Sequence, residues 1–326
     1  MKKFLNYSVP AHVSLAMSEN LEVAVSPNRT LRGGQFRVAL RKNFGGYLFI
    51  MPWLVGFFLF EAGPLLGAVG LSFVDWKFVG PPNWVGLENY QEMFGNELFY
   101  TSLYNTFYYT FIAVGLQLIV ALAAALVINQ RVWGINFYRV AFFIPSIVPA
   151  VGLAYLWMWI YNPEFGLLNA VFDAIQLPRQ RWIYLPQYAK LAYIFMSLWG
   201  VGGTMVIFLA GLQGIPEVLY EAASIDGAAW WARFRFVTIP MLTPVIFFNL
   251  VLGIIGSFQI FTAGFLMTNG SPQHSTLFYV LYLYRSAFED LQFGYASALA
   301  WVLFLIVVFF TLIQFRLSGR WVYYEN

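Results

Sequence analysis

The sequence predicts an all-α membrane protein with six transmembrane helices and both termini in the cytosol. Its composition is 60% hydrophobic and only 10% charged, with a mean hydropathy of +0.67, which lies outside the range of a soluble globular domain. Six apolar segments reach the length of about 20 residues that a helix needs to cross the hydrocarbon core. The basic residues are also distributed unevenly between the connecting loops, which sets the orientation.

We place the six spans at residues 46–72, 106–128, 140–161, 190–211, 242–266 and 293–315. Once Lys190 at the edge of the fourth span is set aside, five spans contain no charged residue, and the first contains only Glu61. A carboxylate inside a span is a candidate proton or ion site. The alternative is a neutral carboxyl, or one bonded to neighbouring helices near Pro64. We favour the alternative, because no other predicted span carries an ionisable partner at similar depth.

The charges of the loops set the topology. With the N-terminus inside, the cytosolic segments hold 13 Lys and Arg residues and the outer segments hold 5, so the positive-inside rule places both termini in the cytosol. We therefore expect a cytosolic tail over 1–42, a six-helix domain over 43–316 with a cytosolic loop at 212–241, and a second cytosolic tail over 317–326. In the outer loops, residues 87–94 have helical spacing, and the turn at 162–169 leads into a short helix. These segments form either a lip around an opening or plain connectors.

The composition excludes several kinds of chemistry. The chain has no cysteine and only two histidines, His12 and His274, so thiolate sites, disulfides and histidine metal clusters are excluded, and we expect no metal site. A formal charge of +3 is too small to indicate nucleic acid binding. The sequence also lacks a phosphate-binding Walker motif, so we expect no ATP hydrolysis by this chain.

Polar uncharged residues gather in the middle of the spans. Asn249, Ser257, Gln259 and Thr262 lie in the fifth span, with Gln117 in the second and Ser197 and Trp199 in the fourth. Hydroxyl groups, amides and flat aromatic faces recognise sugars, but the same groups also hold helices together. Residue type alone leaves both interpretations open.

The cytosolic loop carries two predicted amphipathic helices. Pro216 is favourable at a first helical position and Glu217 in a first turn, and Gly227 permits the left-handed geometry that ends a helix. The apolar side of this helix is formed by Leu219, Ala222, Ala223 and Ile225. A second short helix is expected over 228–236, ending before Pro240. Two such helices suit docking in a groove of a partner, although an ordinary interfacial turn is the alternative.

Residues 199–244 resemble the inner-membrane permeases of ATP-binding-cassette importers, specifically the carbohydrate branch that includes the maltose permeases. The family signature is Glu-Ala-Ala followed by Gly and, further on, an Ile-x-Leu-Pro-like ending. The matching positions are Glu221, Ala222, Ala223, Gly227 and Pro240. Ile239 stands where leucine is usual and keeps the apolar character. The segments 143–149, 161–169 and 268–272 also look like parts of sugar permeases, so that the resemblance extends over about residues 47–316.

The resemblance implies a type I importer architecture in the inner membrane. A second homologous permease subunit, two ATPase subunits that bind ATP and Mg, and a periplasmic solute-binding protein are the implied partners, with no cofactor in this chain. The pathway would alternate between inward-facing and outward-facing states and carry a carbohydrate, expected to be an oligosaccharide. The residues implied to couple the loop to the ATPase are Glu217, Tyr220, Glu221, Ala222, Ala223, Ser224, Asp226 and Gly227.

The same resemblance places the substrate cavity in the middle of the fourth and fifth spans. The implied lining residues are Trp199, Gly200, Gly203, Gly253, Ser257, Gln259 and Ile260. Maltose permeases carry asparagines where Ser257 and Ile260 align, which argues against maltose itself. The predicted cavity spans carry no basic residue, which argues against recognition of an anion deep in the membrane. The alternative classes are an ion-coupled secondary transporter, which would need more ionisable groups than Glu61, and a polytopic enzyme, for which no nucleophile or acid pair is visible.

Overall fold

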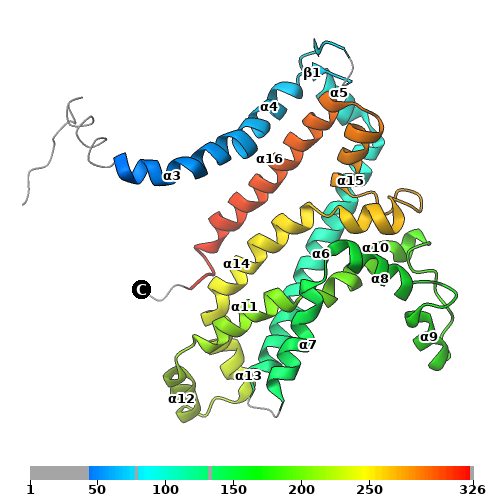
Figure 1. Cartoon of the computed structure of the whole chain (residues 1–326). Helices are drawn as coiled ribbons and strands as arrows, with labels where there is room; N and C mark the ends of the chain where they lie inside the picture. The colour runs from blue at the N-terminus through cyan, green and yellow to red at the C-terminus, as the bar shows by residue number, and fades with distance from the viewer. Residues whose placement is uncertain (1–43, 78–79, 131–133, 324–326) are drawn as a thin grey trace, which may run out of the picture. The chain divides into compact units, whose positions relative to one another are not determined.

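The protein is described from a computed structural model that covers residues 44–77, 80–130 and 134–323 (Figure 1). The predicted N-terminal tail over 1–42 lies outside the described residues. The chain divides into two units, Met1–Pro64 and Leu65–Asn326, and each is considered by itself. The described residues are mainly helical, as the sequence predicts, with a single two-stranded ribbon among them.

Helix α3 (Phe44–Phe57) runs into a π-helical turn, η1 (Phe58–Ala62), and both belong to the first unit. Helix α4 (Gly63–Leu71) follows, and the second unit begins within it, at Leu65. Proline lacks an N–H and its ring clashes with the preceding turn of an α-helix, so the wider turn accommodates Pro64. A Cβ on Gly63 would lie 2.7 Å from the carbonyl oxygen of Phe58. Glu61 lies in this turn and its side chain is exposed. The helix Gly46–Leu71 matches the first predicted span.

At one end of the second unit, short elements form the outer loops. Strands β1 (Val74–Asp75) and β2 (Asn83–Trp84) pair antiparallel, and α5 (Glu88–Gly95) confirms the predicted outer helix. The remaining short elements are α9 (Leu167–Ala174), η3 (Gly264–Thr268), α15 (Tyr279–Tyr284) and η4 (Arg285–Glu289). Asn169 braces the loop after α9, because its Oδ1 accepts hydrogen bonds from the Gln180 N–H at 3.0 Å and from Trp182 Nε1 at 3.1 Å. These loops are therefore structured rather than plain connectors.

Arg179 holds the same loop from its surface. Its guanidinium donates two hydrogen bonds from Nε and one from Nη2 to the carboxylate of Asp173, the shortest at 2.7 Å, and Nη1 donates to the Glu164 carbonyl at 3.1 Å. The Arg179 guanidinium keeps the pKa of Asp173 below its usual value. Both side chains are exposed, so solvent screens the pair and its main effect is to orient the loop.

Three long helices of the second unit are apolar enough to cross a membrane. They are α6 (Glu97–Ile128), α16 (Phe293–Ser318) and the helix Trp230–Phe258, which consists of α13 (Trp230–Arg233), η2 (Phe234–Thr238) and α14 (Ile239–Phe258). The prediction that a separate short helix ends before Pro240 is therefore wrong. The π turn η2 widens the helix ahead of Pro240, and the proline then lies in the first turn of α14, where its missing N–H costs little.

The third and fourth spans, predicted over 140–161 and 190–211, are each bent into two helices. The bends lie where Pro145 and Pro149 interrupt the third span and where Gly200, Gly202 and Gly203 loosen the fourth. Helices α7 (Ile135–Ile147) and α8 (Ala150–Ile160) meet at 101°, and α10 (Pro186–Trp199) and α11 (Gly202–Gln213) meet at 48°. Pro149 drives the residue before it, Val148, into an extended conformation with ψ 127°. The predicted fifth span at 242–266 also ends early, at Phe258. The described residues thus contain four helices long enough to span, or up to six spans if each bent pair counts as one.

Helix α6 runs through the core of the second unit. Three clusters of buried apolar side chains are found among the described residues, and each contains α6 residues, for example Val114, Ala113 and Ala121. The chain after α16 also joins this unit, because the N–H of Tyr323 donates to Thr243 Oγ1 at 2.9 Å and Trp321 packs edge-on against Phe247. Residues 317–323 are therefore anchored against α14 rather than forming a free tail.

Helices α7 and α11 approach most closely at Gly202. A Cβ there would lie 2.5 Å from the carbonyl oxygen of Phe142 and 2.8 Å from the Cα of Phe143, whereas a Cβ on the neighbouring Gly203 would meet nothing within 4 Å. A glycine at a helix crossing permits this approach of two backbones.

We predict that Gly202→Ala lowers the free energy of unfolding by about 1–3 kcal/mol, since the added methyl group forces two helix backbones apart. Gly203→Ala is the matched control and should leave stability within roughly 0.5 kcal/mol of the parent. Thermal unfolding of the purified protein in detergent measures both variants. Equal melting temperatures for the two would contradict the assigned helix contact.

Candidate functional site

The cytosolic loop contains the predicted helix, α12 (Glu217–Ile225). Gly227 has a φ of +77°, which a residue with a side chain adopts at a cost. The Gly227 N–H donates to the Ser224 carbonyl at 3.1 Å, and the Ala228 N–H donates to the Ala223 carbonyl at 2.9 Å. This pair of bonds is the Schellman ending that the glycine predicted. Figure 1 shows α12 at the end of the second unit opposite α5 and β1.

One face of α12 is exposed in the part of the chain that the structure describes. Its exposed side chains are Glu217, Val218, Glu221, Ala222 and Ile225, and Asp226 and Gly227 at the helix end are also exposed. Ile225 is 87% exposed. The apolar side expected from the sequence is partly wrong, because Leu219 turns inward and packs against the cluster around Leu212 and Leu242. The outward face mixes carboxylates with small and apolar groups, as a helix that docks in a groove requires.

Other residues of the predicted coupling set make hydrogen bonds that hold the loop together. The hydroxyl of Tyr220 lies 3.0 Å from Thr238 Oγ1 in η2. Ser224 Oγ donates to the Tyr220 carbonyl at 2.8 Å and accepts from Arg233 Nη1 at 3.1 Å. Ala223 is half-buried. The Tyr220–Thr238 and Ser224–Arg233 bonds tie α12 to the helix Trp230–Phe258.

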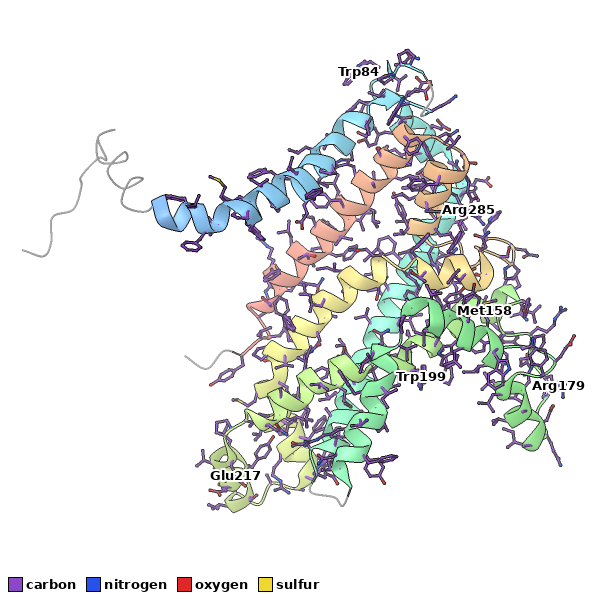
Figure 2. All side chains as sticks on the ribbon, in the orientation of Figure 1. Trp84, Met158, Arg179, Trp199, Glu217 and Arg285 are labelled. Carbon is purple, nitrogen blue, oxygen red and sulfur yellow. The ribbon has the colours of Figure 1, made fainter. Side chains whose placement is uncertain are left out.

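The predicted pathway residues gather where helices break. Trp199 and Gly200 end α10, and Gly203 lies in the first turn of α11. On the fifth predicted span, Gly253 and Ser257 lie in the last turns of α14, and Gln259 and Ile260 follow the end of that helix. The indole of Trp199 is 39% exposed and packs edge-on to Trp157 at 6.0 Å. In Figure 2, Trp199 lies between Glu217 at one end of the second unit and Arg285 toward the other.

A small pocket lies between α6, α11 and α14. Its walls are mostly apolar, and we call it the polar pocket for the three polar side chains that line it. It has a volume of 220 Å³ and is lined by Val114, Gln117, Leu118, Thr204, Ile207, Asn249, Leu252 and Gly253. Gly253 is the member of this set that the sequence assigned to the pathway. Gln117 and Asn249 were noticeable as polar residues in apolar spans, but Thr204 was missed. Their convergence depends on how three helices pack, which the sequence pattern does not specify.

The polar side chains of this pocket have donors and acceptors that make no hydrogen bond to the described part of the chain. Asn249 is buried and its Nδ2 donates to the Val245 carbonyl at 2.9 Å, while within the described ranges its Oδ1 accepts no bond. Gln117 and Thr204 likewise make no side-chain hydrogen bond to the described part of the chain. A Cβ on Gly253 would lie 3.0 Å from Val114 Cγ1, so the glycine keeps α14 close to α6. Amides and a hydroxyl arranged in this way match the hydroxyl groups of a sugar.

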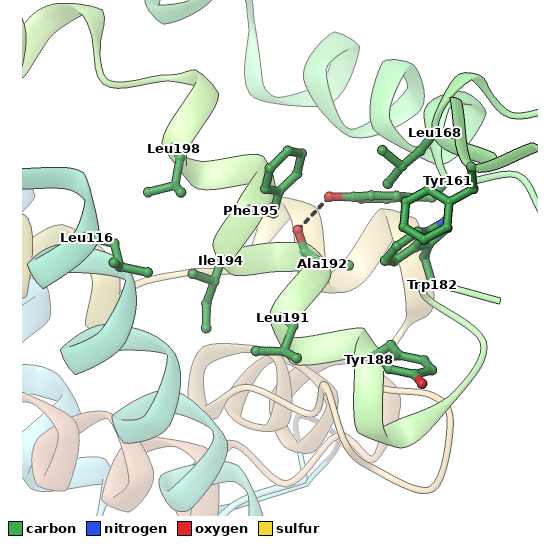
Figure 3. A pocket seen from close by; sticks show the side chains of 11 residues that line it. Leu116, Tyr161, Leu168, Trp182, Tyr188, Leu191, Ala192, Ile194, Phe195 and Leu198 are labelled. Atoms are coloured by element: carbon green, nitrogen blue, oxygen red, sulfur yellow. Dashed lines mark hydrogen bonds between the residues drawn. The ribbon is translucent and has the colours of Figure 1, made fainter. Parts of the chain in front are cut away.

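A larger pocket of 440 Å³ opens between α10 and the α9 loop (Figure 3). Its walls are almost entirely apolar, with Leu191, Phe195 and Leu198 from α10 and Trp182 from the loop. The hydroxyl of Tyr161 is committed to the Ala192 carbonyl at 2.7 Å, as the dashed line shows. This pocket offers almost no polar group to bind a sugar hydroxyl, so it is a weaker candidate for substrate than the polar pocket.

Within the ranges that the structure describes, no group of three or more His, Cys, Asp or Glu side chains could hold a metal ion. The ion pairs found in the described ranges are Asp173–Arg179 and Arg285–Glu289.

Comparison with known proteins decides what kind of membrane protein this architecture represents. Residues 117–323 match the family described as binding-protein-dependent transport system inner membrane component. The chain belongs to this family. Members are multi-pass membrane transport subunits and not ATPases, so the predicted permease class and architecture are confirmed.

Relatives of this permease match along nearly their whole length. It is 39% identical to the probable ABC transporter permease protein YesP of Bacillus subtilis, over 95% of this chain and 99% of the relative. It is 32% identical to the trehalose/maltose transport system permease protein MalF of Thermococcus litoralis, over 84% and 93% respectively. A crystal structure of a bacterial ABC transporter that imports the acidic polysaccharide alginate has a chain with the same fold, with a TM-score of 0.77, 22% identity and coverage of 88% and 99%.

If Trp199 contributes a stacking face to the pathway, Trp199→Ala should raise the KM for transported sugar by about five- to tenfold, since such a contact is worth roughly 1 kcal/mol. Docking of the binding protein should persist. Initial transport rates against sugar concentration in proteoliposomes, measured beside the melting temperature, provide the test. An unchanged KM with a lower melting temperature would mean that Trp199 only packs against Trp157.

Proposed function

We propose that this permease imports an oligosaccharide that a periplasmic binding protein delivers to its outer loops. The exposed face of α12 lies at one end of the second unit, and the outer loops lie at the other. Polar side chains lie near helix breaks between the two ends. This arrangement is the observation that carries the proposal. Family membership gives these parts their context. Relatives include the trehalose/maltose permease and an arabinooligosaccharides transport system permease of Bacillus subtilis, 31% identical over 90% of this chain.

In this proposal the chain pairs with a second, homologous permease subunit in the inner membrane, and two ATPase subunits bind beneath them. ATP and Mg belong to the ATPases, and this chain carries no cofactor. Glu221 and Ile225 on the outward face of α12 enter a cleft of an ATPase. Closure of the ATPases moves α12, and the Tyr220–Thr238 contact transfers that movement to the helix Trp230–Phe258.

The same helix carries Asn249 and Gly253 of the polar pocket. Its displacement therefore changes the pocket between α6, α11 and α14 when the coupling loop moves. The proposed pathway is lined by the seven residues predicted from the sequence, together with Gln117, Thr204 and Asn249. The seven are Trp199, Gly200, Gly203, Gly253, Ser257, Gln259 and Ile260. A structure with the same fold, at 21% identity and a TM-score of 0.76, is a bacterial alginate ABC transporter in complex with an alginate-bound periplasmic protein, which supports a binding protein as a partner.

We predict that Glu221→Ala reduces ATP-driven uptake by about tenfold or more, because it removes a charge-assisted contact to the ATPase worth roughly 1.5–3 kcal/mol. Glu61→Ala removes the same charge from an exposed position in η1, outside the cytosolic loop, and should transport normally. Uptake and ATP hydrolysis are measured together in proteoliposomes that hold the full complex. Wild-type uptake by the Glu221 variant would contradict the coupling role.

Glu61→Gln should retain nearly full transport, and a protonophore should not inhibit uptake while ATP is present. The reason is that Glu61 is exposed in η1 and no relay of ionisable groups accompanies it along the described spans. Uptake is followed with and without an imposed proton gradient. Loss of uptake in a well-folded Glu61→Gln protein would favour an ion-coupled transporter instead.

A further inference from the structure

Three hydroxyl groups form a chain of hydrogen bonds between the fourth and fifth spans. They belong to Tyr193 of α10, to Thr268 at the end of η3, and to Thr276 in the loop that follows η3. Tyr193 and Thr276 are fully buried. The Tyr193 hydroxyl lies 2.9 Å from Thr268 Oγ1, which in turn lies 2.6 Å from Thr276 Oγ1.

The direction of each hydrogen bond follows from the number of hydrogens. A hydroxyl group donates a single hydrogen, and that of Thr276 goes to the Ser271 carbonyl at 2.8 Å. Thr268 is therefore the donor to Thr276, and Tyr193 is the donor to Thr268. The Tyr193 hydroxyl also lies 3.3 Å from the Ala263 carbonyl, directly before η3. Removing this hydroxyl leaves Thr268 Oγ1 without its donor.

Tyr193 thereby joins the two segments that carry the predicted pathway residues. On α10 it precedes Trp199 by about 9 Å along the helix axis, at 1.5 Å per residue. On the fifth span it binds the segment that begins just after Ile260. With the orientation predicted from the loop charges, α10 runs inward, so the junction lies on the outer side of both helix breaks. The position of one segment relative to the other is set at this side chain.

The loop after η3 does not hold its own shape. Asn269, Gln273 and His274 have φ of 45°, 49° and 56°, in the left-handed region that a residue with a side chain adopts at a cost. Such a conformation persists where the surrounding structure fixes it. The hydrogen bond from Thr268 to Thr276 is one of the contacts that do so.

A second contact reaches this loop from α6. Asn105 is only 2% exposed, and its Nδ2 donates to the carbonyls of His274 at 2.7 Å and Leu277 at 3.1 Å. Its Oδ1 accepts from Lys190 Nζ at 3.1 Å. The sequence places Lys190 at the edge of the fourth span, and in the structure it lies in the second turn of α10. Helix α10 is therefore linked to the loop through Asn105 as well as through Tyr193.

We propose that Tyr193 is a positioning residue for transport, whose hydroxyl holds α10 and η3 at the separation that the bound sugar requires. Tyr193 is fully buried, so it acts through Trp199 on one segment and Ile260 on the other, without touching the sugar. Loss of the hydroxyl lets the two segments move apart, and the sugar then binds less tightly. The inference rests on the proposed function and names a residue that sets the geometry of the same pathway.

The test uses the complete transporter in proteoliposomes, with its second permease, ATPase subunits and binding protein. Uptake of maltotriose and of arabinotriose is measured against sugar concentration, beside the melting temperature of each variant. Tyr193→Phe should raise the KM for the transported sugar by about fivefold, since it removes a buried hydrogen bond. The KM is independent of how much protein has folded.

Tyr279→Phe is the matched control. Tyr279 is also fully buried, and its hydroxyl donates to the Leu299 carbonyl of α16 at 2.9 Å, so it joins no pathway segment. This variant should lower the melting temperature as Tyr193→Phe does and leave the KM at the parent value.

Thr268→Val removes the acceptor of the same bond and should raise the KM by a similar factor, which keeps the test available if Tyr193→Phe does not fold. The double variant Tyr193→Phe/Thr268→Val should raise the KM no further than the larger single change, because both substitutions break one interaction.

Each outcome decides between the proposals. A higher KM in Tyr193→Phe and Thr268→Val, with the parent KM in Tyr279→Phe, supports the positioning role. If Tyr193→Phe and Tyr279→Phe have equal KM values, Tyr193 only stabilises the helix packing and the inference is wrong. If the changes in KM multiply in the double variant, the Tyr193–Thr268 bond is not their cause and the inference is also wrong, while the proposed function stands. If ATP drives uptake of neither sugar, the proposed function fails and the inference fails with it.

Discussion

Close packing around helix α6 is the interaction on which the rest of the second unit depends. All three clusters of buried apolar side chains in the described residues draw on this helix. Its buried alanines, including Ala113, Ala121 and Ala125, allow neighbouring helices to approach closely, which is how helices associate where lipid supplies no hydrophobic driving force. On α14, Gly253 likewise permits close approach, because a Cβ there would lie 3.0 Å from Val114 Cγ1 of α6. The pocket, the coupling helix and Lys190 are all positioned relative to this one helix.

The residues assigned to the pathway lie near breaks in the helices. Backbone groups freed by a bend need partners, and a membrane protein tolerates such bends only inside the protein or beside water. The bends at Gly200 and after Phe258 therefore mark where an aqueous pathway is compatible with the fold. Both bends carry residues assigned to the pathway.

In the coupling loop, some residues hold the loop in place and others are exposed. Tyr220, Ser224 and Arg233 are joined by hydrogen bonds and hold α12 against the helix Trp230–Phe258. Glu221 and Ile225 remain exposed on the opposite side. A docking element that transmits movement needs both properties, since a loosely held helix would absorb the displacement. Residues of one sequence motif thus serve two purposes, which only their directions in space distinguish.

The sequence by itself determined the class of this protein. Hydropathy, loop charge and the Glu221–Gly227 motif report local and additive properties, so they identified the spans, the coupling helix ended by Gly227 and the permease family. Tertiary structure alone decided how those parts combine. The meeting of Gln117, Thr204 and Asn249 and the place of Lys190 beside Asn105 depend on contacts between residues far apart in the chain. Hydrophobic periodicity carries no information about such contacts, because every buried face in an apolar helix looks alike until its neighbour is known.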